Sequence, residues 1–166
     1  MGREVRRVPK DWQHPKSREF NIRTGQYEDR YVPMFDRSFA DEMREWYTEW
    51  EKWETGWRPD GTECKTYWEY AGGPPDPERY MPDWPESERT HLMMYEDTSE
   101  GTPISPAFET PEELAKWLAD NNASAFGSMT ATYEEWLSTC KRGWAPSLVI
   151  SGNVMASGVA DLASHS

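Results

Sequence analysis

The sequence predicts an α+β fold: one small domain with a long aromatic-striped helix, two short capped helices and a small antiparallel sheet. Three observations support this class. Tryptophans recur at helical spacing between Trp46 and Trp57, and a Thr-x-Glu-Glu sequence starts a helix at both Thr110 and Thr132. Near the C-terminus, two apolar runs flank the turn-forming segment 151–153, which is typical of a β-hairpin. The length of 166 residues fits one domain.

The segment before the long helix is expected to be a basic, irregular arm packed on the body, residues 1–37. Val5 and Val8 alternate with arginines, which fits a short edge strand or an ordered arm. From residue 11 onward no periodicity holds, and prolines and glycines interrupt the chain. An acidic α+β domain is expected over 38–160, followed by a frayed tail at 161–166.

The long helix is expected from about Phe39 to about Thr55. Ser38 is a good N-cap, with Asp41 three residues further on, and Gly56 is a suitable terminator. Because an α-helix turns by about 100° per residue, spacings of four, three and four place four tryptophans in one stripe: Trp46, Trp50, Trp53 and Trp57. The stripe either builds the core or receives a partner, and both interpretations stay open.

The middle of the chain is expected to be mostly turns and loops. Pro59-Asp60-Gly61 is a strong turn signal, and the proline-rich segment 72–87 excludes regular structure. Short strands are expected at Lys65–Tyr70, from its alternating aromatics, and at Thr90–Glu96, from its apolar run.

The last third is expected to hold two short helices and a hairpin. Thr110 and Thr132 are the expected N-caps, and Gly143 is the expected end of the second helix. The hairpin is expected over residues 147–159.

The charge of the chain is strongly acidic but unevenly distributed. The net charge is −12, yet the first 40 residues hold nine basic and six acidic side chains. Residues 41–120 hold seven basic and 21 acidic side chains. Such a middle favours solubility and attracts basic partners, while it repels nucleic acid and membranes. Acidic side chains along the long helix could also imitate the phosphates of DNA, although a solvated helix face is the simpler interpretation.

No motif in the sequence indicates catalysis. Cys64 and Cys140 are the candidate nucleophiles and His14 and His91 the candidate bases, but no nucleophile signature surrounds them. Metal-ligand spacings are lacking too, and the cluster near His91 (Glu86 and Glu88) flanks a proline-rich loop. We therefore expect no enzyme, no catalytic residue, no metal and no cofactor.

Contacts with nucleic acids and membranes are not favoured. The arm does combine six basic residues with two aromatic rings, an arrangement that can track phosphates and stack on bases: Arg3, Arg6, Arg7, Lys10, Lys16 and Arg18, with Trp12 and His14. The overall charge opposes this role, and pairing of the arm with the acidic body is simpler. The most apolar stretch, Ser147–Leu162, is too short and interrupted to cross a bilayer. We expect a soluble protein of a reducing compartment.

Several strings along the chain resemble a family of small accessory proteins of tailed phages and prophages: Met1-Gly-Arg-Glu-Val-Arg-Arg-Val-Pro9 with Trp12 and His14-Pro15, Tyr80-Met-Pro-Asp-Trp-Pro-Glu86, Glu100-Gly-Thr-Pro-Ile-Ser-Pro106, Thr110–Asp120 and Ala123–Gly127. The resemblance carries no site residue onto this sequence. It implies a viral accessory protein in the cytoplasm of an infected bacterium. By analogy, small acidic phage proteins of this kind resemble inhibitors of host machinery, including anti-defence and anti-CRISPR proteins.

These observations together predict a binding protein, whose partner is a host protein with a basic or nucleic-acid-binding surface. The expected partner-binding residues combine aromatic anchors with carboxylates: Trp46, Trp50, Trp53, Trp57, Glu45, Glu49, Tyr80 and Trp84. The alternative is a small-molecule or nucleotide binder, in which rings sandwich a base and hydroxyls from Thr102, Ser105, Ser124 and Ser128 contact polar groups. An assembly helper and an enzyme of another type also stay open.

Overall fold

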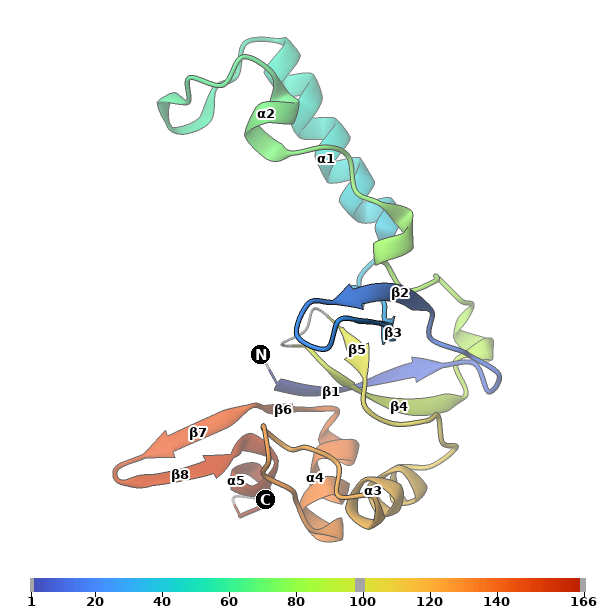
Figure 1. Ribbon diagram of the computed structural model, residues 1–166. Helices are drawn as coiled ribbons and strands as arrows, with labels where there is room; N and C mark the ends of the chain where they lie inside the picture. Colours follow the sequence, from blue (N-terminus) through green and yellow to red (C-terminus); the bar gives the residue numbers. More distant parts are fainter. Residues whose placement is uncertain (1, 98–100, 165–166) are drawn as a thin grey trace. The chain divides into compact units, whose positions relative to one another are not determined.

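A computed structural model describes residues 2–97 and 101–164 of the chain (Figure 1). The chain divides into two compact units. Unit 1 consists of Met1–Pro33 and Trp84–Ser166, and unit 2 consists of Met34–Asp83. The expected arm, body and tail are therefore not the divisions that the structure shows, because the first 33 residues belong to the same unit as the last 83. Each unit is described by itself below.

A four-stranded antiparallel sheet forms the centre of unit 1. Its strands lie in the order β5-β4-β1-β6, and their bounds are Thr102–Pro103 for β5, His91–Glu96 for β4, Gly2–Val8 for β1 and Trp144–Pro146 for β6. The strand predicted at 90–96 is confirmed as β4. A strand rather than an unpaired arm is confirmed at Val5–Val8, as part of β1: Arg3–Val8 pairs with β4, and Gly2–Glu4 also pairs with β6, so that the first residues of β1 lie inside the sheet.

The two faces of β1 and β4 carry different side chains. Val5 lies opposite Met94, and both belong to the hydrophobic core of unit 1 or pack against it. Arg6 lies opposite Met93, and its guanidinium carbon is 4.3 Å from the ring centroid of Tyr95. Since directly opposed residues of an antiparallel pair share one face, the core lies on one side of the sheet and Tyr95 on the other.

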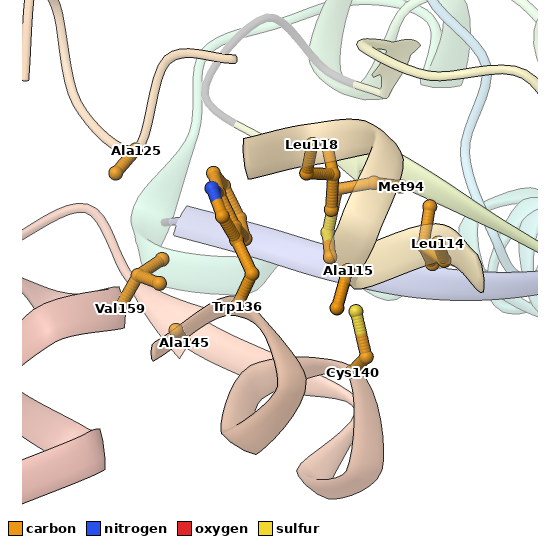
Figure 2. Close-up of a cluster of buried hydrophobic side chains, with 9 residues drawn as sticks. All are labelled: Met94, Leu114, Ala115, Leu118, Ala125, Trp136, Cys140, Ala145 and Val159. Carbon is orange, nitrogen blue, oxygen red and sulfur yellow. The ribbon is translucent and has the colours of Figure 1, made fainter. Parts of the chain in front are cut away.

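The hydrophobic core joins the sheet to helices α3 (Pro111–Asp120) and α4 (Tyr133–Arg142), as Figure 2 shows. Trp136 is fully buried there, with Leu114 and Leu118 from α3 and Met94 from β4. In Figure 1 these helices lie on one side of the sheet, and the hairpin of β2 (Lys16–Asn21) and β3 (Gln26–Tyr31) lies on the other.

Both predicted helix caps in this unit are confirmed. The Glu113 amide donates a hydrogen bond to the Thr110 hydroxyl, and the Glu135 amide donates one to the Thr132 hydroxyl. The Thr132 amide in turn donates to the Glu135 carboxylate, which completes a capping box. Gly143 ends α4 in the left-handed conformation, as expected.

The C-terminal hairpin is confirmed as β7 (Leu148–Ser151) and β8 (Val154–Ser157). The expectation of a frayed tail at 161–166 is wrong for residues 161–164, because Gly158–Ser164 forms helix α5. Residues 165–166 lie outside the described part of the chain. A Cβ atom at Gly158 would lie 1.9 Å from the Pro146 carbonyl oxygen, so only glycine allows this close approach.

Unit 2 is built on helix α1 (Phe39–Glu54), which confirms the expected long helix. The Asp41 amide donates to the Ser38 hydroxyl, as the cap pattern predicts. The strand expected at Lys65–Tyr70 is wrong, because Tyr67–Ala71 forms helix α2. A third threonine cap starts this helix: the Glu69 amide donates to the Thr66 hydroxyl. One-turn 3₁₀ helices occupy Pro59–Gly61 and Pro77–Arg79.

The observed elements confirm the predicted α+β class. Both units contain helices, and the antiparallel sheet and hairpins all belong to unit 1. A third 3₁₀ turn, Glu86–Glu88, precedes β4. Within residues 2–97 and 101–164, no helix is both long and apolar enough to span a bilayer.

Candidate docking surface

Of the expected stripe, Trp46, Trp50 and Trp53 lie on α1, whereas Trp57 follows the end of that helix at Glu54. Helix α2 packs against these rings, so that a continuous series of ring contacts runs through the unit. The ring centroids are 5.2 Å apart for Trp46 and Tyr67, and 5.4 Å for Trp53 and Tyr70. The series extends through Trp57 at one end and through Tyr47 and Trp50 at the other. Trp53 of the stripe is therefore part of the core of unit 2, while Trp57 remains more than one third exposed.

Trp53 is the buried centre of this series, with 3% of its surface exposed. Its ring stacks on Tyr70 at an interplanar angle of 23°. The guanidinium carbon of Arg58 lies 3.8 Å from the Trp53 ring centroid, and Arg58 Nη1 donates to the Trp53 and Trp57 carbonyl oxygens. The expected partner contact at Trp53 is corrected: neighbours of its own unit cover this ring.

Tyr80 is likewise buried, with 8% of its surface exposed. It packs on Phe35 and Phe39, and the Met81 amide donates to the Phe35 carbonyl oxygen at 2.9 Å. Burial raises the pKa of its hydroxyl, and the nearby Glu42 carboxylate adds to the effect. Tyr80 therefore holds the two ends of unit 2 together, and its expected role as a partner contact is corrected in the same way as that of Trp53.

Four rings of unit 2 remain exposed to solvent. Tyr47 has 51% of its surface exposed and Trp68 has 62%, and Trp57 and Tyr70 are each more than one third exposed. Trp46 and Trp50 are half-buried. We define the exposed aromatic set as Tyr47, Trp57, Trp68 and Tyr70. Of these four residues, the sequence analysis identified only Trp57. Tyr47 is next to Trp46 of the stripe, and Trp68 and Tyr70 lie in α2, the helix that the Thr66 cap starts.

Acidic side chains surround these rings. Unit 2 carries 13 acidic and six basic side chains, a net charge of −7 in 50 residues. Glu45 is exposed, as expected for a contact residue. Glu49 has an additional structural role, because its carboxylate accepts a 2.8 Å hydrogen bond from the Tyr67 hydroxyl. Burial of Tyr67 and this hydrogen bond both raise the pKa of the phenol.

Trp84, the last of the expected contact residues, belongs to unit 1 rather than unit 2. It is half-buried, and its ring meets Trp12 edge-to-face at a centroid distance of 4.8 Å. The Trp84 carbonyl oxygen accepts a hydrogen bond from Arg89 Nε. Trp84 is thus part of the packing between the 9–15 segment and the loop before β4.

Two of the three arginines of β1, Arg3 and Arg6, are buried and cannot track phosphates. Arg3 is 2% exposed, and its guanidinium donates to the Ser124 carbonyl oxygen and approaches the Glu96 carboxylate at 3.4 Å. Burial lowers the Arg3 pKa, and the Glu96 and Asp97 carboxylates partly offset this effect. Arg6 is also buried and pairs with Glu4 at 2.6 Å. The nucleic-acid alternative therefore loses both arginines, which a central strand places inside the unit.

Cys140 and His91, two of the candidate catalytic residues, contact neighbouring residues of the protein. Cys140 lies in the hydrophobic core, where burial, with a smaller effect of Glu112, raises the pKa of its thiol to about 12. The reactive thiolate is therefore disfavoured at neutral pH. His91 Nδ1 lies 2.8 Å from the hydroxyl of its neighbour Thr90, and Glu86 pairs with Arg7. Among the described residues, no three His, Cys, Asp or Glu side chains gather closely enough to hold a metal ion.

Two of the hydroxyls proposed for a small ligand are engaged within the protein. The Ser105 hydroxyl accepts from the Met94 amide and donates to the Pro106 carbonyl oxygen. The Ser124 hydroxyl donates to the Gly127 carbonyl oxygen and accepts from Arg3. These serines stabilise loops of unit 1 instead of presenting a free hydroxyl. Comparison with protein-family models, with curated proteins and with solved structures found no match to this chain.

Proposed function

We propose that this protein works by binding: unit 2 docks on a basic surface of a host protein and inhibits or modulates it. The observation that carries the proposal is the exposed aromatic set on a unit with a net charge of −7. Aromatic side chains of this size are rarely left in water on a small unit without a partner that covers them.

The two chemical features of the surface have different tasks in this proposal. The rings supply affinity, because Trp and Tyr are the commonest residues at the energetic centres of interfaces. The carboxylates supply speed and selectivity, because opposite charge steers the encounter and like charge rejects other partners. Complementary charge therefore specifies a partner whose contact surface is rich in lysine and arginine.

A basic surface on a bacterial protein commonly contacts nucleic acid. An acidic unit bound there would compete with phosphates, and the partner would lose its nucleic-acid ligand. The resemblance to phage accessory proteins supports the same direction, an anti-defence or anti-CRISPR inhibitor made in the cytoplasm of an infected bacterium.

The test compares the full chain with two matched variants in affinity capture from a bacterial lysate. Trp68→Ala removes the most exposed tryptophan of unit 2. Trp144→Ala removes an exposed tryptophan of unit 1 and serves as the control. Any protein whose capture is lost with Trp68→Ala is then purified, and the dissociation constant of its complex with the full chain is measured at low and high salt.

The proposal predicts one captured protein with a basic surface. Its affinity falls by about tenfold or more with Trp68→Ala, the range of an interface hot spot, and is retained with Trp144→Ala. Raised salt weakens the binding. Capture that is equal for all three chains, or an affinity that salt does not change, contradicts the proposal.

A further inference from the structure

A cavity of about 790 Å³ opens in unit 1, and Pro103 of the edge strand β5 is among the residues that line it. Three parts of the unit form it: segment 10–16 with Tyr31 of the hairpin, Met93 of β4 with residues 103–107, and Trp117 of α3. Its volume lies in the range of about 300–1,000 Å³ that small-molecule sites occupy. Proposed docking through unit 2 does not use this cavity.

The charge of the cavity is opposite to that of the chain. Lys10 and Lys16 are the charged residues that line it, and no Asp or Glu of the described residues does. Lys16 Nζ lies 4.8 Å from the Tyr31 ring centroid, so its ammonium group is held against another ring of the cavity lining. In a protein with 30 acidic and 18 basic side chains, such a lining selects an anion.

Three large aromatic rings contribute to the remaining wall. Trp12, Tyr31 and Trp117 line the cavity, and each ring is held by a neighbour. Trp12 meets Trp84 edge-to-face, Tyr31 meets His14 at 5.6 Å, and Trp117 lies 6.2 Å from Phe108. Fixed aromatic faces stack on planar rings and lose little conformational entropy when they do so.

A directional chain of hydrogen bonds holds the rim in place. The Trp12 indole donates to the Tyr95 hydroxyl at 3.1 Å, and the Tyr95 hydroxyl donates to His14 Nδ1 at 2.9 Å. His14 Nε2 then donates to the Val32 carbonyl oxygen at 2.6 Å. Both nitrogens of the buried His14 are thus occupied, so this residue positions the rim and leaves ligand contacts to Lys10, Gln13 and Lys16.

From this combination we infer that the cavity binds a mononucleotide, with the base against the aromatic faces and the phosphate at Lys10 and Lys16. The Gln13 side chain is exposed at the rim and offers both a donor and an acceptor to a base edge. An anion without a ring would use only the lysines, and an uncharged ring would use only the aromatic wall. The nucleotide is the ligand class that uses both.

Isothermal titration calorimetry on the full chain tests this site with the four nucleoside 5′-monophosphates, adenosine and inorganic phosphate as probes. At least one mononucleotide binds about tenfold more tightly than adenosine or phosphate alone, since each lacks one half of the contacts. Binding of a single-stranded oligonucleotide without binding of any mononucleotide overturns the inference, as does the absence of mononucleotide binding at millimolar concentration.

Three variants assign the contacts. Lys16→Gln weakens mononucleotide binding about tenfold, by loss of a charge-assisted contact, and leaves adenosine binding unchanged. Tyr31→Leu weakens both. Lys141→Gln, an exposed lysine outside the cavity lining, changes neither. Equal effects of Lys16→Gln and Lys141→Gln overturn the site. Capture through Trp68 of unit 2 is unaffected by these variants, so the two proposals fail independently.

Discussion

The guanidinium carbon of Arg58 lies 3.8 Å from the ring centroid of Trp53 and covers the buried centre of unit 2. The same side chain donates to two carbonyl oxygens at the end of α1. One residue thus combines a cation–π contact with C-terminal capping. Burial of Trp53 under Arg58 and α2 explains why the outer rings, and not the centre of the stripe, are available to a partner.

Replacing Arg58 by alanine should destabilise unit 2. The variant loses the contact with Trp53 and two hydrogen bonds, for an expected loss of about 1–2 kcal/mol in the free energy of unfolding. Urea denaturation followed by tryptophan fluorescence measures it. Arg44→Ala is the control, because Arg44 forms an exposed ion pair with Asp41, a class worth about 0–1 kcal/mol. Equal losses in the two variants would contradict the role of Arg58.

Two threonines of α4 should respond in opposite directions to substitution. Thr132→Ala removes the N-cap and should cost about 1 kcal/mol. The Thr139 hydroxyl is buried and has no hydrogen-bond partner among the described residues, so Thr139→Val should be neutral or stabilise by up to about 1 kcal/mol. Thermal denaturation distinguishes the signs. A large loss with Thr139→Val would show that the hydroxyl is satisfied.

Gly158→Ala should destabilise unit 1 by about 1–3 kcal/mol, the cost of overpacking. The added Cβ would meet the Pro146 carbonyl oxygen, which is backbone and cannot rotate away. Ser164→Ala, at the exposed end of the same helix, is the matched control. Chemical denaturation compares the two, and a harmless Gly158→Ala would mean that α5 packs differently.

Stability should depend on pH through His14. Burial lowers the His14 pKa, the hydrogen bond to Val32 opposes this, and the charge of Arg6 lowers it further; Tyr31 and Tyr95 also face the ring. The unfolded chain therefore binds a proton near pH 6.5 that the folded chain does not. The stabilising contribution is complete above pH 6.5 and is lost as the pH falls toward the lower folded-state pKa, by at most about 1.4 kcal/mol per pH unit.

Urea denaturation between pH 7.5 and pH 5.5 checks this window (about one unit either side of the ordinary histidine value). The His14→Gln variant should be less stable at neutral pH but should lose less stability on acidification than the wild type. Parallel losses in the two proteins would assign the acid sensitivity to other groups.

Local chemistry explains which parts of the fold could be predicted. The caps at Ser38, Thr110 and Thr132 depend on residues three positions apart, so short segments suffice to identify them. The same rule applied to Thr66 and Glu69 would have identified α2, where alternating aromatics suggested a strand instead. Helix α5 has weak local signals, and its glycine is required by a distant proline.

Tertiary contacts explain the rest. Charge suggested that Arg3 and Arg6 belong to a surface arm, whereas both are buried on strand β1, which pairs with β4 over Arg3–Val8 and with β6 over Gly2–Glu4. In the candidate site, periodicity located the stripe on α1 but not the position of α2, which buries Trp53 and leaves Tyr47 and Trp68 exposed. The cavity in unit 1 joins residues 10–31 to residues 93–117, a juxtaposition that spacing does not reveal.

The most direct test of docking through unit 2 is ¹⁹F NMR of the full chain labelled with 5-fluorotryptophan, titrated with the purified partner from the capture experiment. Signals are assigned by single Trp→Phe variants. Docking predicts that the Trp57 and Trp68 signals shift or broaden on binding, while the Trp144 signal stays unchanged. A complex that shifts Trp144 and leaves Trp57 and Trp68 unchanged would contradict the proposed docking surface.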